Sequence, residues 1–184
     1  MDLKSTDELT IAIRSIGIRT WDELKSYVRA LPYGRNTNRK DLSLVISEKR
    51  GTCSSKHAFL KLIAKLNNIP NVELILCLYK MKLENTPGIG NYLKEAKLTY
   101  IPEAHCYLVD HGINLDLTNK NSTITRIEDD IIEEISIASH EVSEFKVNYH
   151  KDYLMQWIIK ERIPLSFDQI WSTRELCIAS LADN

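Results

Sequence analysis

Two β-forming runs in the middle of the chain constrain its fold most strongly. Residues 72–83, VELILCLYKMKL, alternate and are rich in strand-forming residues, so we expect a strand there. Residues 105–118, HCYLVDHGINLDLT, contain two short apolar runs around a turn, which predicts a β-hairpin. Segments with helical spacing of apolar residues precede and follow these runs. Strands grouped between helices predict a single α+β domain over residues 1–184.

Capping signals mark where the flanking helices begin. In a capping box, a Ser or Thr is followed three residues later by Glu or Gln. Three such pairs predict helix starts: Ser5 with Glu8, Thr20 with Glu23, and Ser166 with Gln169. A short helix closed by Gly51 is expected in residues 41–51, and a longer one follows it and ends near Asn68 in a left-handed cap. Residues 131–139, IIEEISIAS, fit a strand and a helix about equally well. The predicted organisation is N-terminal helices in residues 1–50, a core in 51–120 and a helical part in 145–184.

Charge and hydropathy narrow the range of partners. The net charge is −1 and the pI is near 6.5, so the chain lacks the basic stripe that binds nucleic acid or an anionic membrane. No apolar run reaches the roughly 18 residues that a membrane helix needs. The first 20 residues lack the pattern of a signal peptide. We therefore expect a cytoplasmic protein whose four cysteines stay reduced.

Cys53 is the cysteine whose position most favours chemistry. It stands at the expected N-terminus of a helix, where unpaired backbone N–H groups and the helix dipole favour the thiolate. Gly51 is expected to let the chain turn sharply there, and Ser54 and Ser55 are small enough to leave the sulfur accessible. The alternative is an inert buried thiol, since most free cysteines are of that kind. The other cysteines lie in apolar runs and are expected in the core: Cys77, Cys106 and Cys177.

A nucleophilic cysteine also needs a base and a group that orients the base, and the hairpin offers both. If Asp110 and His111 form a two-residue turn, His105 lies directly opposite Asp116, with Cβ atoms about 5 Å apart. A three-residue turn would instead put these two side chains on opposite faces of the sheet. Asp110 and His111 themselves are expected to be exposed turn residues.

Four short motifs occur in an order that resembles a known family. They are Gly51-Thr52-Cys53, Ile69-Pro70, His105-Cys106-Tyr107 and Asp116-Leu117-Thr118. In this order they resemble the transglutaminase-like superfamily of papain-fold cysteine enzymes, over roughly residues 45 to 120. The resemblance implies a papain-type α+β fold, in which the helix that begins with Cys53 packs on an antiparallel sheet carrying His105 and Asp116. Extra helices then lie at both termini.

The same resemblance implies an activity. Cys53, His105 and Asp116 would form a catalytic triad that acts on amide or thioester carbonyls through a thioacyl-enzyme, without a metal or an organic cofactor. The substrate would be a peptide, a protein or a small amide. Hydrolysis by a peptidase or amidase is our first choice over transfer to an amine. The alternative is a non-catalytic module that keeps the fold and binds a peptide or protein, and the oligomeric state stays open.

The implied site needs donors for the oxyanion and an aromatic neighbour for the histidine. The backbone N–H of Cys53 is expected to supply one oxyanion donor. Candidates for the second donor lie in the upstream loop: Tyr33, Asn36 and Asn38. Tyr107 stands where the family usually has a tryptophan, so it is a candidate for substrate binding.

His57 departs from the family pattern, which usually has a small residue at this position. It lies one helical turn after Cys53, on the same face. It either tunes the thiol, competes as its base, or makes a buried polar contact. Cys53, His57 and His105 would give three ligands for zinc, but no fourth ligand has characteristic spacing, so no metal is expected.

Overall fold

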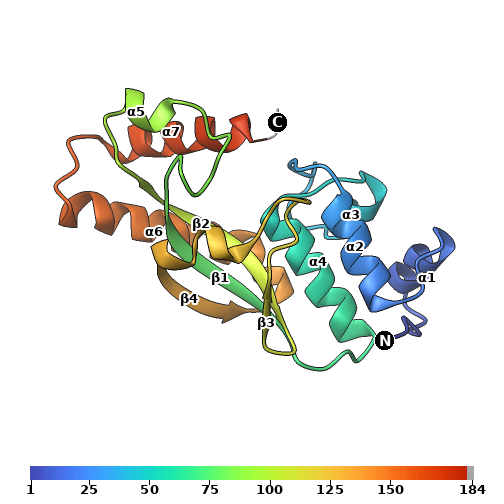
Figure 1. Ribbon diagram of the computed structural model, residues 1–184. Helices are drawn as coiled ribbons and strands as arrows, with labels where there is room; N and C mark the ends of the chain where they lie inside the picture. Colours follow the sequence, from blue (N-terminus) through green and yellow to red (C-terminus); the bar gives the residue numbers. More distant parts are fainter. Residues whose placement is uncertain (182–184) are drawn as a thin grey trace. The chain divides into compact units, whose positions relative to one another are not determined.

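The computed structural model describes residues 1–181 and has an α+β architecture (Figure 1). The seven described α-helices are α1 (Glu8–Ser15), α2 (Trp21–Ala30), α3 (Leu44–Ser47), α4 (Cys53–Leu66), α5 (Tyr92–Glu95), α6 (Glu144–Lys160) and α7 (Phe167–Ser180). The strands are β1 (Val72–Met81), β2 (Ile101–Asp110), β3 (Ile113–Leu115) and β4 (Ile131–Ile137), and they form one antiparallel sheet in the order β3-β2-β1-β4. The described residues also form three short 3₁₀ helices: η1 (Ile124–Arg126), η2 (Glu128–Asp130) and η3 (Ser139–Val142). The α+β class predicted from the sequence is confirmed.

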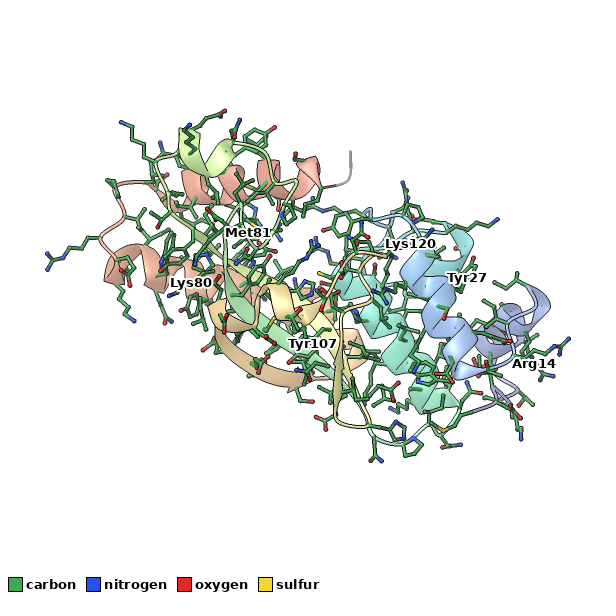
Figure 2. All side chains as sticks on the ribbon, in the orientation of Figure 1. Arg14, Tyr27, Lys80, Met81, Tyr107 and Lys120 are labelled. Atoms are coloured by element: carbon green, nitrogen blue, oxygen red, sulfur yellow. The ribbon has the colours of Figure 1, made fainter. Side chains whose placement is uncertain are left out.

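The chain divides into two compact units. The first contains residues 1–76, 106–124 and 135–143, and the second contains residues 77–105, 125–134 and the part from 144 onward. The division falls within β1, β2 and β4, so each of these strands contributes residues to both units. Strand β1 is buried on both faces over most of its length, with Glu73 and Lys80 exposed; Figure 2 labels Lys80 and its fully buried neighbour Met81.

Two predicted capping boxes are confirmed and one helix start is corrected. Thr20 caps α2 and Ser166 caps α7, each in a complete capping box. The first helix is capped by Asp7 instead of Ser5, because the Asp7 carboxylate accepts a hydrogen bond from a backbone N–H of the first turn. Asp7 directly precedes the helix, which places its carboxylate closer to those N–H groups.

Other boundaries differ from the prediction as well. The short helix expected to close at Gly51 ends at Ser47, because Lys49 adopts a left-handed conformation with φ of 52°. The strand expected over residues 72–83 ends at Met81. Residues 131–137, which fitted both patterns, form β4. Asn68 has φ of 53°, so the left-handed residue predicted after the long helix is confirmed.

Helix α4 forms the core of the first unit. Its buried apolar side chains have essentially no exposed surface: Ala58, Phe59, Leu60, Ile63 and Ala64. Helices α1, α2 and α3 and the turn η3 all pack against it. Since helix stability in proteins comes mainly from such packing, the position of the first residue of α4 is set by the unit around it.

The β2–β3 hairpin has a two-residue turn, but the turn lies one residue later than predicted. His111 and Gly112 occupy it, with φ of 52° and 81°. Two positive φ angles define a type I′ turn, for which glycine is well suited. Asp110 pairs with Ile113, so the register is shifted by two residues from the expected one.

This register overturns one argument for the predicted site. Asp116 lies beyond the end of β3, and its position would face Tyr107 instead of His105 if the pairing continued. The expected direct opposition of His105 and Asp116 is therefore wrong. The cause is the turn chemistry: the glycine favours a turn centred on His111 and Gly112, and this choice fixes every later pair.

Asp110 was expected to be exposed, and the structure shows it buried. Its carboxylate accepts hydrogen bonds from Trp21 Nε1 at 2.9 Å, Lys25 Nζ at 2.7 Å and His111 Nδ1 at 2.7 Å. Burial acts to raise the pKa of Asp110, but the hydrogen bonds outweigh it and hold the pKa below its usual range. Asp110 therefore ties the end of the hairpin to α2, while His111 is exposed as predicted.

The second unit has its own buried ion pair. Arg174 of α7 donates to Glu103 of β2 through Nε at 2.7 Å and Nη2 at 2.5 Å. His150 of α6 donates from Nε2 to the carbonyl of Pro102 at 2.8 Å. Burial lowers the pKa of His150 to about 4, so its imidazole is neutral at pH 7. These bonds join α6 and α7 to β2 within this unit.

Candidate functional site

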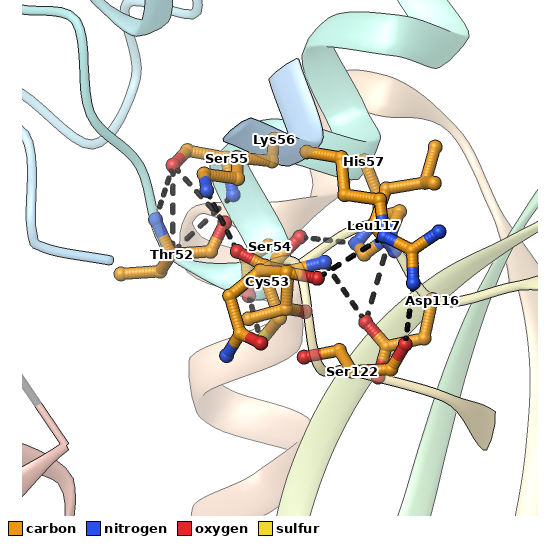
Figure 3. A network of polar contacts seen from close by, with 12 residues as sticks. Thr52, Cys53, Ser54, Ser55, Lys56, His57, Asp116, Leu117 and Ser122 are labelled. Atoms are coloured by element: carbon orange, nitrogen blue, oxygen red, sulfur yellow. Dashed lines mark hydrogen bonds and ion pairs between the residues drawn. The ribbon is translucent and has the colours of Figure 1, made fainter. Parts of the chain in front are cut away.

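Cys53 is the first residue of α4 and is partly exposed, whereas the other three cysteines are buried, as predicted (Figure 3). The helix start is fixed by Thr52, whose Oγ1 accepts from the amide of Ser55 while Ser55 Oγ accepts from the amide of Thr52. The Sγ atom of Cys53 lies 3.8 Å from Ser54 Oγ. A thiol in this position faces the positive end of the dipole of a 14-residue helix.

Gly51 is needed here for close packing. Its φ angle is not positive, so a left-handed backbone is not the reason for a glycine at this position. A Cβ atom at Gly51 would lie 2.8 Å from Lys56 Cγ and 2.8 Å from Ser55 Oγ. Gly51 also forms a parallel bridge with Tyr33, which joins the upstream loop to the start of α4.

His57 connects α4 to the segment that follows β3. Its Nδ1 donates to the carbonyl of Cys53 at 2.7 Å, and its Nε2 accepts from the amide of Leu117 at 2.7 Å. The side chain is fully buried, and Figure 3 shows it pointing from α4 toward Leu117 and Asp116. These bonds require the neutral tautomer with hydrogen on Nδ1. Of the roles considered for His57, the geometry favours the buried polar contact.

The Asp116 carboxylate lies near the His57 ring. Its Oδ1 lies 3.9 Å from His57 Nε2 and accepts a hydrogen bond from the amide of Thr118 at 3.0 Å. The Asp116 side chain is 8% exposed. His57 therefore links the backbone of Cys53 to Asp116, two of the predicted catalytic residues, although the pairing that suggested Asp116 was wrong.

Lys56 is a site residue that the sequence analysis missed. Its side chain is fully buried, and Nζ donates to the carbonyls of Leu31 at 2.5 Å and Thr118 at 2.6 Å. Burial lowers the pKa of Lys56 to about 8, while the charges of Asp116 and Cys53 act in the opposite direction. One signal was available: this lysine lies three residues after Cys53, on the same helical face.

The upstream loop is held by its own amide side chains. Asn36 Nδ2 donates to the carbonyls of Leu44 and Arg50 and to the carboxylate of Glu48. Asn38 Oδ1 accepts from a backbone amide two residues later in the same loop. Both asparagines therefore stabilise the loop conformation, and the amide donors of Asn36 are directed at acceptors in α3 and in the segment that follows it.

His105 belongs to the second unit, whereas Cys53, His57 and Asp116 belong to the first. Its ring meets the edge of Tyr79, with centroids 6.2 Å apart and planes at 80°. Tyr107, two residues further along β2, is 2% exposed. Tyr107 is therefore a core side chain and has little surface with which to bind a substrate.

The part of the chain that the structure describes contains no group of three or more His, Cys, Asp or Glu residues arranged to hold a metal ion. Within residues 1–181, no helix combines the length and the apolar composition needed to cross a membrane. Comparisons of the chain with protein-family models, with curated proteins and with solved structures find no match.

Proposed function

We propose that this chain is a cysteine-dependent enzyme that cleaves amide bonds through a thioacyl-enzyme, with a transglutaminase-like fold. One observation carries the proposal: Cys53 is the partly exposed cysteine of the four, and it begins a 14-residue helix whose His57 bonds to Leu117, the residue after Asp116. A half-exposed thiol at a helix N-terminus is the environment in which cysteines become nucleophilic.

From the order of the motifs we propose His105 as the base: in the proposed reaction Cys53 loses its proton to this base, and Sγ attacks the amide carbonyl carbon. The C–N bond then breaks, and the amine leaves with the proton held by the imidazole. Water attacks the thioester, which releases the carboxylic acid and returns the thiol. The backbone N–H of Cys53 donates to the oxyanion. The roles of His105 as base and of Asp116 as its orienting carboxylate are proposed from the order of the motifs alone.

The hydrogen bonds of His57 argue against His57 as the base. The Nε2 lone pair of His57 already accepts from Leu117, and its Nδ1 hydrogen is donated to the carbonyl of Cys53. A histidine whose two nitrogens are both bound by backbone groups has no free lone pair with which to take a proton. His57 is therefore not the proposed base.

The experiment that tests the proposal is acylation by p-nitrophenyl acetate, followed by peptide mass spectrometry. We expect an acetyl thioester on Cys53 and a burst of p-nitrophenol, both lost in Cys53→Ala and strongly reduced in His105→Ala. His140→Ala is the matched control, since His140 is exposed on η3, and should keep the burst. If wild type and Cys53→Ala release p-nitrophenol equally, the proposal is wrong and a non-catalytic binding module is the better interpretation.

The acyl acceptor needs a separate measurement. With a primary amine added, a hydrolase releases mainly acetate, whereas an amine transferase forms mainly the acetylated amine. We expect hydrolysis to dominate. If the acetylated amine predominates, Cys53 is still the nucleophile, but the proposed reaction is amine transfer instead of hydrolysis.

A further inference from the structure

A fully buried lysine beside a partly exposed cysteine is an unusual feature of the first unit. Lys56 lies three residues after Cys53 on α4, and neither of its hydrogen-bond acceptors is a carboxylate. Burial of an ammonium group is costly, and an apolar side chain of similar volume often stabilises a fold at least as well. Packing alone therefore does not explain a lysine at this position.

The contacts of Lys56 join the segments that carry the proposed site. Its Nζ bonds to Leu31, which ends α2 and leads into the upstream loop, and to Thr118, which follows Asp116 by two residues. Asp116 itself is bonded to the amide of Thr118. Gly51 provides the space for this arrangement, because a Cβ atom there would collide with the stem of Lys56.

We propose that Lys56 is a positioning residue, an inference that rests on the proposed function. Its buried ammonium holds the segment from Asp116 to Thr118 beside α4 and electrostatically stabilises the thiolate of Cys53. Lys56 lies one helical turn after Cys53 on α4, and its Nζ and the Asp116 carboxylate both bond to the backbone of Thr118, so Cys53 and Asp116 are the charged groups that act on it. Both are negative when ionised, so one cation interacts favourably with each of them. The interaction is reciprocal: the thiolate of Cys53 stabilises the charged form of Lys56, and the ammonium of Lys56 stabilises the thiolate.

The first test is the pH dependence of iodoacetamide labelling of Cys53 in wild type, Lys56→Met and Lys56→Arg. We expect Lys56→Met to raise the apparent pKa of Cys53 by about one unit, which slows labelling about tenfold at acidic pH. Lys56→Arg should restore most of the wild-type profile because it keeps the charge. Lys61→Met is the control: Lys61 lies on the same helix and also donates to a backbone carbonyl, that of Val72. It should leave the profile unchanged.

A folded Lys56→Met protein with the wild-type pH profile would overturn the inference. If this variant does not fold, the wild-type lysine is followed instead by NMR of its ¹⁵N-labelled ammonium group. Replacing Cys53 by serine should lower the pKa of Lys56, and an unchanged pKa would equally overturn the inference. The outcomes also separate the two proposals. A Cys53 acetyl thioester that forms normally in Lys56→Met, with an unshifted profile, refutes the role of Lys56 alone, whereas no thioester in wild type refutes the proposed function.

Discussion

Replacement of His57 tests how the candidate site is held together. His57→Ala removes a fully buried ring and leaves the amide of Leu117 without its acceptor. The unsatisfied N–H costs about 1–3 kcal/mol, and the lost bond to the carbonyl of Cys53 costs about 1 kcal/mol. Truncation of a buried side chain of this size adds a cavity cost, so we expect a total loss of about 3–5 kcal/mol. This is a large part of the stability of an ordinary domain.

The measurement is urea denaturation followed by tryptophan fluorescence. His57→Leu separates the two contributions, because leucine fills most of the volume and removes only the hydrogen bonds, so its loss should be about 1–3 kcal/mol. His140→Ala, at an exposed position, should change the free energy of unfolding by less than about 0.5 kcal/mol. A His57→Leu protein as stable as wild type would show that these hydrogen bonds do not hold the Asp116 segment.

Three further predictions concern stability. Arg174→Met leaves Glu103 as a buried carboxylate without its ion pair, so the free energy of unfolding should fall by about 3–5 kcal/mol. The double variant with Glu103→Leu should recover most of this loss. If the double variant does not recover it, this account is wrong. The pKa of His150 is about 4 in the folded chain and 6.5 in a free histidine. Neutral His150 therefore contributes about 3 kcal/mol to the free energy of unfolding above pH 6.5, and this contribution is lost as the pH falls toward 4. His150→Phe should flatten the stability profile measured by urea denaturation in that interval, and a slope identical to wild type would refute the assignment. Gly51→Ala should cost about 1–3 kcal/mol, because the new Cβ atom meets the anchored stem of Lys56, and a variant of wild-type stability would show that the lysine can move aside.

Much of the secondary structure could be predicted because it depends on neighbours in the chain. Thr20 and Ser166 cap their helices through bonds to residues three positions away, and such bonds are visible as a sequence pattern. The alternation in residues 72–83 likewise predicted β1, since side chains of a strand point to opposite faces. The long helix after Gly51 and its first residue, Cys53, were found for the same reason.

Features that depend on distant residues were missed or misplaced. Asp110 was expected in solvent, but Trp21 and Lys25 surround it from a helix more than 80 residues earlier in the chain. Lys56 has the pattern of an ordinary helical lysine, and its burial is decided by carbonyls of Leu31 and Thr118. Local periodicity contains no information about such partners.

The sequence by itself determined the α+β class, the hairpin and the thiol at the head of a helix, because capping, alternation and turn chemistry act over a few residues. Only the tertiary structure decided which polar groups surround that thiol. The backbone amide of Leu117 donates a hydrogen bond to Nε2 of His57, and the buried ammonium of Lys56 donates to two backbone carbonyls. A buried polar group must find a partner, and that partner is chosen by packing between segments that are far apart in the sequence.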